Sequence, residues 1–255
     1  MIIDAHVNIT YNGKWFDTEH DASLARLLDE MDMAGIDQCL LISMPFATTN
    51  EYIAKVTEKF PEKFRGLGHL DFAKDNLLTQ VDEILSMGLA GVKIHPRMQG
   101  IDCNAPHLME LFNYLDDQQT VVMIDGYYQS NNKKVSLLNL QPFKYDLLAK
   151  SYPNIRFIIS HMGGHRAFDL FFVARSNKNV FIDNSHALKY FYGTSLIQDM
   201  VWIMDKLDEK IVFGSDFPEY GLSEYLEHFK EITQDTVTLR KELIYTNLNK
   251  IIKFS

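Results

Sequence analysis

The sequence predicts an α/β fold, the (β/α)8 TIM barrel, with an extra C-terminal helix. Eight short apolar runs alternate with segments of helical periodicity, which is the pattern of a parallel sheet with crossover helices. Several of these runs end in His or Asp. The length of 255 residues is also usual for one such barrel. We therefore expect a single barrel domain over residues 1–255.

The predicted strands are rich in Ile, Val, Leu and Phe, as is typical of strands covered on both faces. They span 2–9, 38–43, 64–70, 91–95, 120–125, 155–161, 180–184 and 211–215. Helical periodicity marks 21–34, 51–60, 76–87, 106–116, 142–151, 167–176, 195–207 and 223–230. Gly35, Pro61, Gly88 and Pro153 follow or end helices, where such residues stop a helix. A last helix over 236–252 is expected to pack against the outside of the barrel.

An open doubly wound sheet has the same alternation of strands and helices, so it is the competing fold. Two observations argue against it. No Gly-rich phosphate loop follows the first strand, and polar residues end many strands instead of gathering at one switch point. The closed barrel is the better interpretation.

Composition excludes several kinds of partner. The chain has 25 basic and 34 acidic residues and a net charge of −9, with no run of Lys and Arg, which argues against nucleic acid. No apolar run approaches the length of a membrane span, and the first residues lack the features of a signal peptide. Cys39 and Cys103 form no spacing motif, which fits a reducing compartment. We expect a cytoplasmic protein.

Polar residues at strand ends indicate where the chemistry lies. A parallel barrel places all strand C-termini on one face, so side chains far apart in the sequence meet there. We expect His6, Asp125, His161 and Asp216 to converge in one pocket. Along the first strand Asp4, His6 and Asn8 alternate with Ile3, Ala5 and Val7, and we expect the three polar residues to share the lumen face.

Basic residues near the same face indicate the substrate. Lys93 and His95 are two apart on the fourth strand, with Val92 and Ile94 on the opposite face. Together with Arg97 and Arg166 they are candidate ligands for a carboxylate, since Arg binds such a group through two parallel hydrogen bonds. The competing interpretation is that Arg97 and Arg166 pair with surface acidic residues.

The loops and the end of the seventh strand supply further candidates. Residues 183–186 end that strand, so one of them is a candidate to orient a polar group of the substrate, and His186 is a candidate to line the pocket. The aromatic pairs at 15–16 and 127–128 lie in strand-end loops. They are candidates to cover a substrate or to form the contact of a homo-oligomer.

Four strings resemble the amidohydrolase superfamily, in particular its amidohydrolase-related branch, which includes aminocarboxymuconate-semialdehyde decarboxylase and several lactonases. They are Ile-Asp-Ala-His at 3–6, Gly-Val-Lys-Ile-His-Pro at 91–96, Ser-His-Met-Gly-Gly at 160–164 and Phe-Gly-Ser-Asp-Phe-Pro at 213–218. The resemblance implies that His6 and Asp216 hold a divalent metal and that His161 acts on the substrate.

The chain departs from this family pattern at two ligand positions, which carry Asn8 and Asp125 instead of His. The resemblance makes His6, Asn8, Asp125 and Asp216 the candidate metal ligands. Replacing two imidazoles by an amide and a carboxylate gives a harder site, which would hold zinc less selectively and favour manganese or magnesium. Some lactonases of the superfamily use no metal, so catalysis without a metal stays open.

We therefore predict a hydrolase that acts on a small, carboxylate-bearing substrate through an activated water. Asp216 would accept the proton of that water, and His161 would polarise the substrate carbonyl. Two alternatives stay open. One is a non-oxidative decarboxylase that uses the same pocket, and the other is a catalytically degenerate barrel that only binds a ligand.

Overall fold

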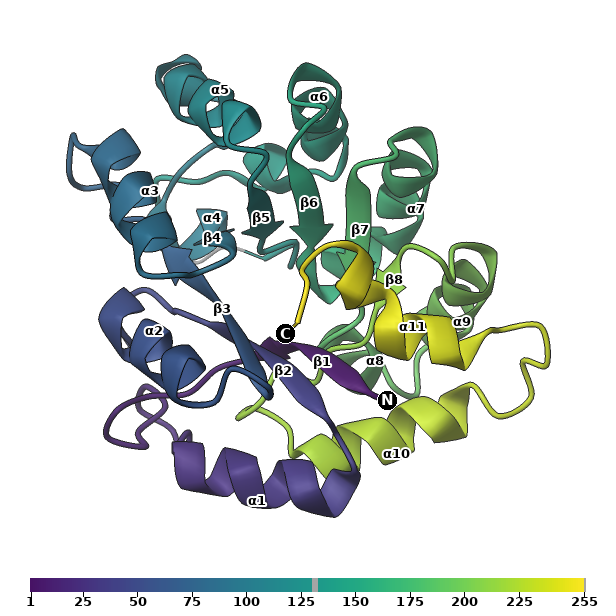
Figure 1. The fold of residues 1–255 in the computed structure, drawn as a ribbon. Helices are drawn as coiled ribbons and strands as arrows, with labels where there is room; N and C mark the ends of the chain where they lie inside the picture. Colours follow the sequence, from purple (N-terminus) through teal and green to yellow (C-terminus); the bar gives the residue numbers. More distant parts are fainter. Residues whose placement is uncertain (130–132, 255) are drawn as a thin grey trace.

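A computed structural model describes residues 1–129 and 133–254 of the chain. Its eight strands are all parallel and follow one another in chain order around the sheet, with the long helices outside them (Figure 1). The strands are β1 Ile3–Val7, β2 Gln38–Ile42, β3 Phe64–His69, β4 Gly91–Ile94, β5 Val121–Ile124, β6 Arg156–Ile159, β7 Val180–Asp183 and β8 Ile211–Val212. The predicted barrel is confirmed.

The sheet closes between its first strand and the segment that follows its last. The Ala5 amide donates to the Phe213 carbonyl at 2.7 Å, and the Asp216 amide donates to the His6 carbonyl at 3.0 Å. The Asn8 amide donates to the Phe217 carbonyl at 2.8 Å. Closure satisfies the backbone groups that an open sheet would leave at its edges. The doubly wound alternative is therefore excluded.

The helices fall where the periodicity predicts them, within a few residues at each end. They are α1 Leu24–Ala34, α2 Asn50–Lys59, α3 Leu77–Ser86, α5 Met109–Asp117, α6 Phe143–Ser151, α7 Ala167–Ser176, α9 Leu196–Lys206, α10 Leu222–Ile232 and α11 Lys241–Thr246. Two short helices were not predicted, α4 Pro96–Gln99 and α8 Ala187–Tyr190, and both follow strand ends. Within the described residues, no helix has the length and apolar character needed to cross a bilayer.

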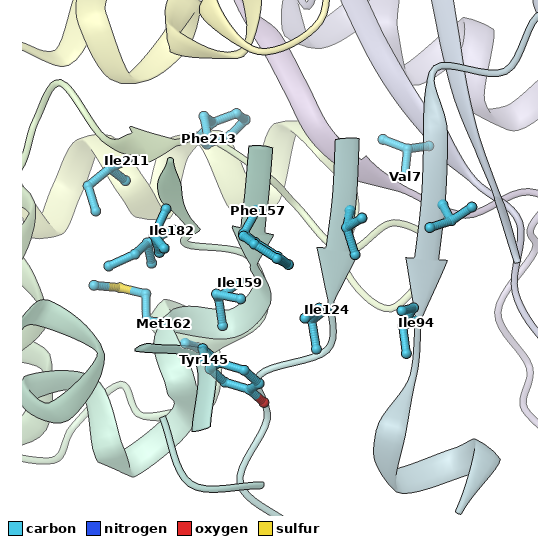
Figure 2. Packing of buried hydrophobic residues seen from close by; sticks show 14 of the residues in the cluster. Val7, Ile94, Ile124, Tyr145, Phe157, Ile159, Met162, Ile182, Ile211 and Phe213 are labelled. Carbon is cyan, nitrogen blue, oxygen red and sulfur yellow. The ribbon is translucent and has the colours of Figure 1, made fainter. Parts of the chain in front are cut away.

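The main core lies between the strands and the helices. Val92 and Ile94 of β4 face outward into it, as the alternation predicts, and contribute to the same buried cluster as Leu27 and Met31 of α1. Figure 2 shows part of this layer, in which one outward residue after another comes from neighbouring strands: Val7, Ile94, Ile124, Ile159, Ile182 and Ile211. Burial of such side chains contributes about 25 cal/mol for each Å² removed from water, so this layer fixes the strands in place.

The C-terminal segment does not form the single outer helix that we expected over 236–252. It forms the short α11 and a 3-10 helix, Asn247–Lys250. Leu248, Ile251 and Ile252 then join a second buried cluster, whose strand members come from all around the ring. These members are Ile3, Ala5, Leu40, Ile42, Leu67, Val121, Met123, Ile158 and Val212. The chain end therefore covers the lumen at the amino ends of the strands, and in Figure 1 it lies over the centre of the ring. The extra C-terminal helix is thus confirmed as the short α11, whose Ile244 joins the main core. The rest of the predicted span covers this mouth of the barrel instead of continuing the helix, because the mouth is apolar.

The first strand also differs from the expected alternation. Its pairing with β2 shifts register between Asp4 and Val7, which is a β-bulge or similar irregularity. Ile3 and Ala5 lie in the lumen cluster, so Asp4 does not share the face of His6. The Asp4 carboxylate instead accepts hydrogen bonds from the backbone amides of His6 at 2.9 Å and Ser215 at 3.0 Å. Burial raises the pKa of Asp4 to about 7. This side chain supports the backbone on which His6 and Asp216 are mounted.

Candidate active site

A cavity of about 450 Å³ opens at the carboxyl ends of the strands. Three of the four residues predicted to converge there line it, namely His6, His161 and Asp216. The fourth, Asp125, is fully buried beside them, with a carboxylate oxygen 3.4 Å from His161 Nε2. The other lining residues are Trp15, Phe16, Thr18, Met44, His95, Arg97, Met98, Tyr127, Gln129, His186, Tyr190 and Glu219.

Asp125 belongs to a group with three neighbours of potential positive charge. Arg97 Nε donates to one carboxylate oxygen at 3.0 Å, and His95 Nε2 lies 2.9 Å from the other. Burial alone would raise the pKa of Asp125, but Arg97 and His95 outweigh it and hold the pKa well below its usual range. Asp125 is therefore a charged residue with one oxygen bonded to Arg97, while its other oxygen lies against the His95 ring without a recorded hydrogen bond.

His95 and His161 have opposite electrostatic environments, although both contact Asp125. Burial lowers the pKa of His95 to about 4, which keeps this ring neutral near pH 7. Burial also acts to lower the pKa of His161, but the hydrogen bond to Asp125 and the charge of Asp216 reverse the shift and raise it. His161 is therefore the imidazole of this pair that is better able to carry a proton toward the pocket.

His6 is oriented by a carboxylate that was not predicted as a partner. Its Nδ1 lies 2.5 Å from a carboxylate oxygen of Asp183, at the end of β7, and both side chains are buried. Burial alone would raise the pKa of Asp183, but its interactions with His6 and the amide of Ser185 outweigh it and hold the pKa at about 2. The charged Asp183 fixes the proton on Nδ1, so His6 Nε2 presents a lone pair toward Asp216, 3.4 Å away.

Ser185 links this pair to His161. Its hydroxyl lies 2.8 Å from the Asp183 carboxylate, 3.1 Å from His6 Nδ1 and 3.0 Å from His161 Nδ1. The hydroxyl is thus at the centre of the three side chains, and all of them are buried. Strand β7 therefore orients both histidines of the pocket through two residues, Asp183 and Ser185.

Asp216 is a carboxylate that faces the cavity without a short hydrogen bond from a side chain. Its nearest side-chain partners are His6 Nε2 at 3.4 Å, Asn8 Nδ2 at 3.4 Å and His186 Nδ1 at 3.5 Å, all at or beyond the upper limit for a hydrogen bond. Its backbone has a φ of 68°, and His161 and His186 each have a φ of 59°. Positive φ values in residues other than Gly are strained, and they often occur at functional sites.

The metal prediction can be tested against this donor arrangement. In the described part of the chain, one group of three or more potential ligands has its ligand atoms within 4.8 Å of one another: His6, His161 and Asp183. The Ser185 hydroxyl already lies among them. The 2.5 Å between His6 and Asp183 is also a hydrogen-bond distance, since two ligands about 2.1 Å from one ion stand about 3.4 Å apart.

Of the four ligands that the resemblance implies, two make hydrogen bonds that compete with metal binding. His6 Nε2 and Asp216 are suitably spaced at 3.4 Å. Asn8, however, presents its amide nitrogen to Asp216, because that nitrogen also donates to the Phe217 carbonyl at 3.1 Å. Asp125 is bonded to Arg97. A tight site for a divalent metal needs three or four good donors, so this arrangement does not fit one.

The four basic residues proposed for substrate binding occupy different environments. Arg97 and His95 line the cavity. Lys93 is fully buried, and its ammonium donates to the Ser160 hydroxyl at 2.9 Å instead of lining the cavity. Arg166 pairs with Asp169 and contacts the ring of Tyr128, and it is not among the lining residues. Among the described residues that line the cavity, Arg97 is thus the one that is a lysine or an arginine.

Sequence reasoning gave too little weight to the end of β7. Asp183 and Ser185 were considered only as possible orienting groups for the substrate, whereas they contact His6 and His161 directly. A signal was available, because Phe181, Asp183 and Ser185 are at alternate positions of an apolar strand. His186 lines the cavity as proposed, and its ring stacks on Tyr190 at 5.2 Å.

Comparisons with known proteins agree with this fold. Residues 3–247 match the family model described as amidohydrolase. A curated relative, 2-amino-3-carboxymuconate-6-semialdehyde decarboxylase from Dictyostelium discoideum, is 22% identical over 219 residues, which cover 73% of this chain and 61% of the relative. The chain thus corresponds to under two thirds of that relative's length.

Solved structures show the same fold at low sequence identity. An uncharacterized TIM-barrel protein from Bordetella bronchiseptica aligns with a TM-score of 0.82 at 19% identity, covering 98% of this chain and 97% of that one. A probable 2-pyrone-4,6-dicarboxylic acid hydrolase from Acinetobacter baumannii gives 0.72 at 14% identity, covering 98% of both chains. The 5-carboxyvanillate decarboxylase from Sphingomonas paucimobilis gives 0.70 at 13% identity, covering 100% and 99%.

The barrel and the polar residues at its strand ends define a TIM-barrel protein with a site of enzymatic type. The family match over nearly the whole chain is specific, and the chain belongs to the amidohydrolase family. The relatives with named activities include both hydrolases and decarboxylases.

Proposed function

We propose that the chain is a hydrolase that cleaves a C–O or C–N bond next to a carbonyl group in a small, carboxylate-bearing substrate. The observation that carries the proposal is the position of Asp216, a carboxylate that faces the cavity while Asp125 is bonded to Arg97 and lies 2.9 Å from His95. A base needs an accessible oxygen, and Asp216 has one.

The positive charge of Arg97 is the reason for proposing a substrate that carries a carboxylate. The Arg97 Nε is used by Asp125, and within the described residues the structure records no hydrogen bond to its two terminal nitrogens. A guanidinium with two unused nitrogens can bind a carboxylate through both of them. The names of related structures, which include a pyrone dicarboxylic acid hydrolase and a carboxyvanillate decarboxylase, agree with such a substrate.

The reaction follows from these positions. Asp216 takes a proton from a water molecule while the water oxygen attacks the substrate carbonyl carbon. His161 stabilises the negative charge that develops on the carbonyl oxygen, since its pKa is raised and it lies on the cavity wall. The tetrahedral intermediate then collapses, the C–O or C–N bond breaks, and the leaving group takes the proton from Asp216.

His6 and Asp183 have a supporting role in this scheme. The His6 lone pair at Nε2 lies beside Asp216 and is fixed there by Asp183. It can therefore accept a hydrogen bond from Asp216 once that carboxyl group is protonated, which holds the proton in place for the leaving group. No step in this scheme depends on a metal ion, because the donors do not fit one.

Hydrolysis in water enriched in ¹⁸O tests the proposed reaction. A panel of small carboxylate-bearing esters, lactones and amides is incubated with the purified protein, and the products are examined by mass spectrometry. We expect one ¹⁸O atom in the newly formed carboxyl group. Release of carbon dioxide without ¹⁸O in the organic product would replace hydrolysis by decarboxylation, the activity in the name of the curated relative.

Metal analysis of the same preparation tests the second part of the proposal. We expect less than stoichiometric zinc, manganese and magnesium, and turnover that is unchanged after treatment with a chelator. A stoichiometric ion that is lost together with activity would contradict catalysis without a metal. If no substrate is turned over and Asp216→Asn changes nothing, the alternative of a barrel that only binds a ligand is favoured.

A further inference from the structure

The cavity has opposite charges on its two sides. Arg97 follows β4 and Glu219 follows β8, and these strands are four positions apart in the ring of eight. The two strands therefore lie on opposite sides of the barrel mouth, as the positions of α4 and β8 in Figure 1 show. Both side chains line the cavity, and Asp216 is three residues before Glu219. A bound molecule that spans the cavity meets a cation at one end and a carboxylate at the other.

The Arg97 side has room for one negative charge. Arg97 is the one lysine or arginine among the described residues that line the cavity. Its guanidinium is held against Asp125 and over the ring of Tyr127, with 5.4 Å between the guanidinium carbon and the ring centre. Lys93 is buried and bonded to Ser160, and Arg166 pairs with Asp169. A second substrate carboxylate would therefore find no cationic side chain of this kind in the described wall.

The Glu219 side favours a positive charge. The Glu219 side chain is 41% exposed, and the basic side chain recorded beside it is His20, whose Nε2 is 3.9 Å away, beyond hydrogen-bond distance. Trp15 and Phe16 line the same cavity, with their ring centres 4.8 Å apart. An exposed carboxylate together with aromatic rings attracts an ammonium group and repels a carboxylate.

We propose that this cavity selects substrates with one carboxylate at the Arg97 end and an ammonium group at the Glu219 end, with the reacting carbonyl between them, and that it discriminates against dicarboxylates. The inference rests on the proposed hydrolysis, because that reaction places the substrate carbonyl between the two ends of the cavity. It adds the substrate class and assigns Glu219 a role in specificity, which the family match does not.

Three matched esters of 4-hydroxybenzoate test the inference. Each has the same scissile ester and the same carboxylate on the leaving group, and the acyl chain differs only at its far end. The 4-(trimethylammonio)butyryl ester ends in a cation, the 5,5-dimethylhexanoyl ester is its neutral isostere, and the glutaryl ester ends in a carboxylate. The quaternary ammonium group cannot attack its own ester. Release of 4-hydroxybenzoate is followed by absorbance, and binding of the matched non-reacting ethers is measured by titration calorimetry.

We expect kcat/KM and affinity to rank cation above neutral above anion, with at least about a tenfold difference between the two charged compounds, as for other electrostatic selections of this size. Glu219→Gln should bring the cationic and neutral compounds to within about threefold of each other. Glu227→Gln, at an exposed position of α10, is the matched control and should keep the wild-type ranking.

The outcomes separate this inference from the proposed hydrolysis. Equal binding of the three ethers, preference for the glutaryl compound, or an unchanged ranking in Glu219→Gln would overturn the inference even if all esters are cleaved. The expected ranking in binding without cleavage of any ester would support the charge selection and count against hydrolysis.

Discussion

The two carboxylates of the site, Asp125 and Asp216, have the same chemistry and different surroundings. Asp125 is buried, and its two oxygens face Arg97 and His95 at 3.0 and 2.9 Å. Asp216 borders the cavity, and its closest side-chain partners lie 3.4 to 3.5 Å away. A buried carboxylate held ionised by an arginine is a poor base and a good support, whereas one with accessible oxygens can accept a proton. The difference supports the proposal that Asp216 is the reactive carboxylate and that Asp125 positions Arg97.

The largest expected effect is a difference in kcat between variants of Asp216 and Asp125. Asp216→Asn keeps the shape of the side chain but removes the base, so we expect kcat to fall by about 10³-fold with little change in KM. Asp125→Asn should instead raise KM by weakening the position of Arg97. Steady-state kinetics on any substrate found in the ¹⁸O screen measures both, with Asp235→Asn at an exposed position as the control. Equal losses of kcat in both variants would remove the distinction.

Stability should separate them in the opposite direction. Asp125→Asn removes a buried charge from Arg97 and His95, so we expect a loss of about 2 kcal/mol in the free energy of unfolding at pH 7. Asp216→Asn should change it by under about 0.5 kcal/mol, because it removes no short hydrogen bond. Urea unfolding followed by circular dichroism measures both values.

The pH dependence of the same difference gives a further check. The folded pKa of Asp125 lies below its ordinary value of 3.8, so the stability it contributes is complete above that value and is lost as the pH falls through the folded pKa. The gap between wild type and Asp125→Asn should therefore shrink below about pH 4. Between about pH 7 and 5 it should widen as His161 protonates, because Asp125 raises the pKa of His161. A gap that grows as the pH falls below about 4 would contradict the ion pair.

The smallest expected effect concerns the link between the two histidines. Ser185→Ala removes a hydroxyl that contacts Asp183, His6 and His161. We expect a loss of about 1 to 2 kcal/mol in stability and about a tenfold decrease in kcat, since both rings lose part of their orientation. Ser86→Ala, which removes an exposed hydroxyl bonded to a backbone carbonyl, is the control. Unchanged kcat in Ser185→Ala would show that Asp183 alone orients His6.

Much of the fold follows from the sequence because its signals are local. Apolar runs and helical periodicity locate all eight strands, and the parity of Lys93 and His95 against Val92 and Ile94 is correct. The bulge in β1 was missed because strict alternation assumes uniform pairing. One of the two backbone amides that the Asp4 carboxylate binds there belongs to Ser215, over two hundred residues away. The chain end was misplaced because only the closed barrel reveals an uncovered lumen.

The sequence predicted which residues gather at the candidate site better than it predicted which of them contact one another. Strand-end positions placed His6, His161 and Asp216 at one cavity. The partner of each residue depends on distances across the ring, which no spacing in the sequence encodes. This is why Asp125 was predicted as a metal ligand and is found bonded to Arg97, and why Asp183 was not recognised as the partner of His6.

A crystal structure of the wild-type protein with its reaction product bound tests the division of roles between the two carboxylates most directly. We expect the product carboxylate to bind the terminal nitrogens of Arg97 and the newly formed carboxyl group to lie beside Asp216. Asp125 should still be bonded to Arg97 Nε. A metal ion held jointly by His6, Asp125 and Asp216, with Asp125 released from Arg97, would contradict this expectation.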